Sequence, residues 1–139
     1  MKAPKFDDVK VGTELPPLKL PPISRHQLAL YCGGSGDHNP IHVDSDFAKK
    51  FGMKDVFAHG MLSMAFLGRQ VTAFAPQAAI RKLGTRFSAI TWIGDQITVT
   101  SKVVGKREEH GEKLIDLEVN CINQNGQPTL QGHATVTAA

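Results

Sequence analysis

The sequence has little cysteine and no long apolar run. Its two cysteines, Cys32 and Cys121, are far apart and lack CxxC spacing, so the sequence predicts neither a zinc site nor a disulfide framework. No apolar segment approaches the length of a membrane span, and the first ten residues, MKAPKFDDVK, do not resemble a secretory signal. We therefore expect a cytoplasmic protein that does not bind membranes.

The sequence also lacks a strong charge of either sign. Its formal net charge is +3, and the basic residues are scattered, which argues against nucleic acid as a partner. A diffuse positive field suits a small anionic ligand, and it equally fits a role in solubility. Nothing repeats and no linker divides the chain, which is 41% hydrophobic, so we expect one globular domain over residues 1–139.

Two short helices are expected before residue 53. Ser24 is a candidate N-cap for the segment SRHQLALYCGG, with Gly33-Gly34 as its stop. Asp44 or Ser45 caps a second helix, DFAKKF, which Gly52 closes.

An apolar helix and a series of strands follow. Residues 60–74, GMLSMAFLGRQVTAF, are apolar almost all the way round, so this helix must be largely enclosed. Four alternating segments come next: TRFSAITWI, QITVTSKVVGKRE, KLIDLEVNCIN and PTLQGHATVTA. The turns between them contain Gly94-Asp95, His110-Gly111 and Asn125-Gly126, the last a strong type I′ hairpin signal. With an edge strand or extended lead-in over residues 13–23, they predict an α+β fold, an antiparallel sheet of about five strands wrapped around a long central helix.

Asp37 and His42 are the candidate chemical groups. They lie in a segment rich in turn-forming residues, where Pro40 keeps Asn39 from helical geometry, and we expect an irregular loop. A carboxylate and an imidazole together supply the base and the acid that adding or removing water requires. The alternatives are structural roles in the turn and metal binding by Asp37, His38 and His42, for which there is no recognised spacing.

A second candidate is Ala58-His59-Gly60-Met61, where the apolar helix begins. Unpaired N–H groups at the positive end of a helix can stabilise an enolate-like thioester oxygen, and Gly60 lets a carbonyl approach the main chain. Alternatively, His59 caps the helix and Gly60 relieves crowding.

These residues resemble a known family. The segment Tyr31–His42, with Ala48 after it and FAHGMLSM downstream, is similar to the MaoC-like dehydratases and (R)-specific enoyl-CoA hydratases, including single-domain (R)-hydroxyacyl dehydratase subunits of actinobacteria. The resemblance implies a hot-dog fold and a lyase of fatty-acid metabolism. Its substrates would be trans-2-enoyl or (R)-3-hydroxyacyl thioesters of coenzyme A or acyl carrier protein.

The resemblance also implies roles for individual residues. Asp37 and His42 would be the catalytic dyad, the Gly60 amide would face the thioester oxygen, and the dyad loop would be supported by Asn39, Ser35 and Gly36. No cofactor or metal is implied, and the assembly would be a homodimer, a heterodimer or a higher oligomer. An acyl tunnel would involve Met61, Leu62 and Phe66, which core packing also explains. Phosphate contacts would come from Arg81, Lys82 and Arg86, which also fit a solvated surface.

Two other functions compete with this interpretation. A hot-dog thioesterase often places an essential carboxylate on or beside the helix, whereas no Asp or Glu occurs from Val56 through Gly94. Alternatively, the chain is the active half of an obligate heterodimer with a non-catalytic acyl-binding subunit, since it keeps both Asp37 and His42.

Overall fold

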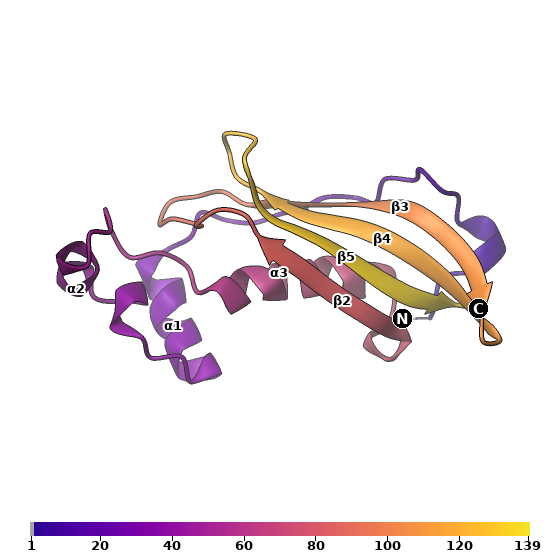
Figure 1. Ribbon diagram of the computed structural model, residues 1–139, viewed down its shortest axis with the longest axis horizontal. Helices are drawn as coiled ribbons and strands as arrows, with labels where there is room; N and C mark the ends of the chain where they lie inside the picture. Colours follow the sequence, from indigo (N-terminus) through magenta and orange to yellow (C-terminus); the bar gives the residue numbers. More distant parts are fainter. Residues whose placement is uncertain (1) are drawn as a thin grey trace.

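The computed structural model describes residues 2–139 and consists of one antiparallel sheet with helices beside it (Figure 1). The strand order is β1-β3-β4-β5-β2, and the sheet curves over helix α3 (Gly60–Phe74). This confirms the predicted α+β fold, although α3, with 15 residues, is of only moderate length. No helix in residues 2–139 is long and apolar enough to cross a membrane.

Helix α3 has the predicted bounds, but it is not enclosed all the way round. Its buried residues form one stripe, which faces the sheet: Leu62, Ser63, Phe66, Leu67, Gln70 and Val71. Met61, Ala65 and Arg69 are exposed on the other side. The prediction of a largely enclosed helix is therefore wrong for the single chain, because one sheet covers only one face of the helix.

Three long strands form the centre of the sheet: β3 (Thr98–Glu109), β4 (Glu112–Ile122) and β5 (Pro128–Ala138). At one edge β1 (Leu18–Lys19) pairs with β3, which confirms the predicted edge strand, and at the other edge β2 (Ile80–Phe87) pairs with β5. Buried side chains alternate along the start of β3, as expected where one face of a sheet covers the core.

The first strand after α3 lies earlier in the sequence than predicted. The alternation of TRFSAITWI indicated a strand over residues 85–93, whereas β2 ends at Phe87 and residues 88–91 leave the sheet. The N–H of Ser88 still donates to the carbonyl of Thr129. The N–H of Ala89 donates to the same carbonyl, so the regular pairing ends here, and β5 begins at Pro128, which has no N–H to donate.

Two short helices precede α3: α1 (Arg25–Ser35) and α2 (Ser45–Lys50). They begin after the N-caps Ser24 and Asp44, as predicted. The predicted stop at Gly33-Gly34 is wrong, because α1 continues to Ser35 and ends where Gly36 adopts the left-handed conformation, with φ of 75°. Short 3-10 turns lie at Phe6–Asp8, Pro40–His42 and Gln77–Ala79.

The type I′ geometry predicted for Asn125-Gly126 occurs instead in the hairpin between β3 and β4. His110 and Gly111 both have positive φ, 50° and 79°, which a type I′ turn between β3 and β4 requires. In the other hairpin Gly126 has positive φ and Asn125 does not, so the predicted type I′ turn there is wrong. The N–H of Gly126 donates to the carbonyl of Asn123, and the loop is longer because Asn123 also holds it through its side chain.

Candidate active site

The loop between α1 and α2 is held by side chains that bind the main chain a few residues away. The N–H of Asp37 donates to Ser35 Oγ (3.1 Å), that of Asn39 to Asp37 Oδ1 (3.2 Å), and that of Ile41 to Asn39 Oδ1 (3.1 Å). Such bonds restrict a turn locally. An irregular loop was predicted here, and its last three residues instead form the 3-10 turn Pro40–His42.

His42 is 9% exposed, and a hydrogen bond to the main chain of Phe57 fixes the orientation of its ring. Its Nδ1 lies 2.8 Å from the main-chain carbonyl of Phe57. Because a carbonyl oxygen only accepts hydrogen bonds, Nδ1 must carry the hydrogen, and the neutral ring keeps its lone pair on Nε2. The loop therefore presents an imidazole in one defined tautomer.

His59 joins this group, although the sequence pattern did not place it there. Its ring is 1% exposed and stacks on His42, with ring centres 4.0 Å apart. Its side chain makes no capping bond to α3, so the capping alternative is wrong. Burial, together with the neighbouring His42, lowers the pKa of His59 below its usual value.

Asp37, His42 and His59 offer a carboxylate oxygen and two ring nitrogens within 4.8 Å of one another. One water molecule spans such a distance with two hydrogen bonds of about 2.8 Å. The same three groups are close enough together to be considered as metal ligands, and in each ring one nitrogen lies at hydrogen-bond distance from a main-chain carbonyl. His38, the third ligand of the predicted metal alternative, is exposed and outside this group.

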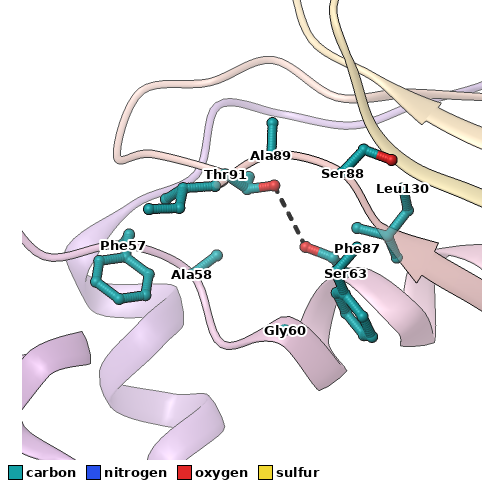
Figure 2. Close-up of a pocket in the computed structure, with 10 residues that line it drawn as sticks. Phe57, Ala58, Gly60, Ser63, Phe87, Ser88, Ala89, Thr91 and Leu130 are labelled. Atoms are coloured by element: carbon teal, nitrogen blue, oxygen red, sulfur yellow. Dashed lines mark hydrogen bonds between the residues drawn. The ribbon is translucent and has the colours of Figure 1, made fainter.

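A cavity of about 350 Å³ adjoins the start of α3 (Figure 2). Its lining combines the start of α3 with the segment that follows β2: Phe57, Ala58, Gly60, Ser63, Phe87, Ser88, Ala89, Ile90, Thr91 and Leu130. The lining is mainly apolar, with the hydroxyls of Ser63 and Thr91 3.5 Å apart within it. A Cβ atom on Gly60 would lie 3.1 Å from the ring of Phe87, so the wall has little room for a side chain at position 60.

Residues 57–60 contact both the cavity wall and the loop that carries Asp37 and His42. The carbonyl of Phe57 accepts from His42, and the N–H of Ala58 donates to the carbonyl of Thr91 in the cavity wall (2.9 Å). Gly60 lies in the wall at the N-terminus of α3, where main-chain N–H groups lack helical partners. This segment links Gly60 to the loop of Asp37 and His42, although neither Asp37 nor His42 is among the residues that line the cavity.

The residues predicted for an acyl tunnel lie elsewhere. Met61 is exposed, and Leu62 and Phe66 are packed in the core, so none of the three lines the cavity. The wall comes instead from residues 87–91, whose alternating sequence is that of a strand and gives no signal of a cavity.

The three predicted phosphate contacts all lie on β2. Arg81 is bound to the carboxylate of Glu112 by two of its nitrogens, and this hydrogen bonding raises the pKa of Arg81 and lowers that of Glu112. Lys82 and Arg86 are exposed. Arg86 directly precedes the cavity-lining Phe87 on β2, where successive side chains point to opposite faces of the sheet, and it does not line the cavity.

Comparison with known proteins identifies the family. The MaoC like domain matches residues 8–125. An (R)-specific enoyl-CoA hydratase of Rhodospirillum rubrum is 34% identical over 135 residues, which make up 94% of this chain and 89% of the hydratase. The chain therefore belongs to the MaoC-like family.

Solved structures share the fold. A MaoC-like dehydratase superposes on 99% of this chain with a TM-score of 0.88 and 31% identity, and this chain spans 43% of that longer protein. The R-hydratase PhaJ1 of Pseudomonas aeruginosa, in its unliganded form, gives a TM-score of 0.85 and 25% identity, over 98% of this chain and 86% of the hydratase. These likenesses confirm the expected hot-dog fold.

Proposed function

We propose that this chain, as a single hot-dog domain, catalyses the reversible hydration of trans-2-enoyl thioesters to (R)-3-hydroxyacyl thioesters. The observation that carries the proposal is the hydrogen bond from His42 Nδ1 to the Phe57 carbonyl. It leaves the lone pair of Nε2 free to exchange a proton, and a ring nitrogen of His42 lies within 4.8 Å of a carboxylate oxygen of Asp37. The similarity to an (R)-specific enoyl-CoA hydratase supports the same reaction.

In this mechanism a water molecule lies between Asp37 and His42. One of the two takes a proton from the water, and the hydroxide forms a bond to C3 of the enoyl group while the C2–C3 double bond shifts its electrons toward the thioester oxygen. The proton taken from the water is then delivered to C2 by the dyad, and the thioester carbonyl is restored, so that both groups end in their starting protonation states. The reverse sequence releases water.

Gly60 supplies the second part of the mechanism. Its N–H lies at the N-terminus of α3, at the positive end of the helix dipole, where it can donate to the developing enolate oxygen. The absence of a side chain lets the thioester approach the main chain. The acyl group then occupies the apolar cavity, whose volume is near the lower end of the range of about 300–1,000 Å³ for ligand sites, which favours short acyl chains.

The rival thioesterase function finds less support. Helix α3 carries no acidic residue, so it offers no carboxylate to direct water at the thioester carbonyl. The carboxylate grouped with the two imidazoles is that of Asp37, which lies on the loop before α2. An acid paired with an imidazole suits proton transfer to and from carbon.

The purified chain is expected to hydrate crotonyl-CoA to (R)-3-hydroxybutyryl-CoA. The loss of absorbance from the conjugated enoyl thioester measures the rate, and chiral analysis of the product measures its configuration. The same assay follows hydrolysis through release of free thiol. Thiol release without hydration would replace the proposal with the thioesterase alternative, and an (S) product would contradict the proposed geometry.

We propose further that the active species is a homodimer. β2 is an edge strand, and the apolar side chains of Met61, Phe87 and Ile90 are exposed beside the cavity, where a second chain can cover them. Asp37 is also exposed in the single chain. Sedimentation velocity is expected to give twice the chain mass of 15.1 kDa. A monomer that gains activity only with a second, different chain would support the heterodimer instead.

A further inference from the structure

His59 contacts both members of the proposed dyad. The face of its ring stacks on His42, with an interplanar angle of 29°. Its Nε2 lies 3.2 Å from the main-chain carbonyl of Asp37. The ring is also held from α1, where Tyr31 packs against it edge-on at 4.8 Å and Cys32 Sγ lies 3.4 Å from Nε2.

The contact with the Asp37 carbonyl defines which nitrogen of the His59 ring carries the hydrogen. A carbonyl accepts only, so Nε2 carries the hydrogen and Nδ1 is left as an unprotonated nitrogen. Nδ1 is buried and has no hydrogen-bond partner within residues 2–139. A proton gained there would place a charged ring in the interior against a second imidazole, which burial disfavours. The titratable groups that face His59 are Tyr31, Cys32, Asp37 and His42.

We infer that His59 is a positioning residue, a neutral ring that holds the plane of the His42 imidazole and the main chain of Asp37. The inference rests on the proposed hydration at this site. His59 acts through two groups that must be aligned with one water, and a misplacement of about 1 Å at such groups lowers turnover by about 10²-fold. The Asp37 loop is otherwise exposed, so a contact from the interior is an effective way to hold it.

Two substitutions separate the two contacts. His59→Phe keeps an aromatic face against His42 and loses the donor to the Asp37 carbonyl. His59→Gln keeps an amide N–H near the place of Nε2 and loses the stacked ring. Each variant is expected to lower kcat by about 10- to 100-fold with KM changed by less than about threefold, because alignment and not substrate binding is lost.

Val71→Ala is the matched control, because Val71 is a fully buried residue of α3, the helix that His59 precedes. It is expected to lower the melting temperature and to leave kcat within about twofold of wild type, since its cavity lies in the core. The positioning role would be overturned if both His59 variants kept kcat within about twofold of the wild-type value, or if their kcat fell no further than that of Val71→Ala.

Hydrogen exchange tests the loop contact without any substrate. The amides of Asn39 and Ile41, which donate to side chains of the loop, are expected to exchange faster in His59→Phe and at the wild-type rate in His59→Gln. If wild-type protein did not hydrate crotonyl-CoA, the proposed function would fail, and this measurement would still decide the loop contact. Unchanged exchange of these two amides in His59→Phe would overturn the inferred contact between His59 and the Asp37 loop.

The pH dependence of stability tests the neutral state of the ring. Because the pKa of His59 is lowered in the folded protein, the unfolded chain binds a proton first, near its ordinary pKa of about 6.5. The stability from this residue is present above about pH 6.5 and is lost as pH falls below it. Between about pH 8 and pH 5.5 the urea midpoint should fall less for His59→Phe than for wild type. An equal fall would contradict a buried neutral His59.

Discussion

Asp37→Asn and His42→Ala should each lower kcat for enoyl-CoA hydration by about 10²- to 10⁴-fold, the usual contribution of a general acid or base. In Asp37→Asn the introduced amide oxygen would still accept the N–H of Asn39, as Asp37 Oδ1 does, so the loop would keep its shape while losing the carboxylate. His42→Ala removes the lone pair that the bond to Phe57 leaves on Nε2. Steady-state rates with crotonyl-CoA measure both losses.

The same loop offers a control for this experiment. His38 lies next to Asp37 in the chain and is exposed, so His38→Ala should keep the wild-type rate. The double variant of Asp37 and His42 should be little slower than the worse single variant, because the two groups act as one unit. Wild-type turnover in either single variant, with the melting temperature preserved, would refute the assigned mechanism.

Gly60→Ala should lower kcat/KM by about 10²-fold, the scale of losing one donor to an oxyanion. The new Cβ would lie 3.1 Å from Phe87 Cε1, in the wall of the cavity and beside the N–H that the thioester oxygen is proposed to reach. The substrate would then be held away from the main chain. The ratio kcat/KM across several enoyl-CoA lengths measures the effect, which should be present for every length.

Gly68→Ala is the control for Gly60→Ala. Gly68 lies on the same helix, and its added Cβ would meet only Leu83 at 4.0 Å, an ordinary contact. This variant should keep full activity and gain about 0.5–1 kcal/mol of stability, because alanine loses less backbone entropy on folding. Full activity in Gly60→Ala would show that the thioester does not need to approach the main chain of Gly60 closely.

The features that local sequence chemistry determines were predicted correctly. The bounds of α3 follow from an apolar run that begins at Gly60 and ends before Pro76, and the caps of α1 and α2 follow from Ser24 and Asp44. The loop of Asp37 and His42 could be predicted for the same reason, because its turn-forming residues bind their own main chain. The resemblance to the family added the fold that arranges these elements.

Features set by contacts between distant segments could not be predicted. The end of β2 depends on where β5 begins, at Pro128, and no pattern within residues 80–93 shows this. The cavity wall at residues 88–91 was missed for that reason. The sequence correctly places His59 at the start of α3 but does not show its stacking on His42, which exists only after α1, the loop and α3 come together.

The bond between Ala58 and Thr91 has a practical consequence for redesign toward bulkier acyl groups. The obvious place to enlarge the cavity is the stretch of residues 88–91, yet its displacement would pull on the carbonyl of Phe57 and rotate the imidazole of His42. Leu130 borders the same space from β5 and pairs with Phe87 rather than with Phe57. Trimming Leu130 should therefore broaden the range of accepted chains while turnover of the shortest ones is maintained.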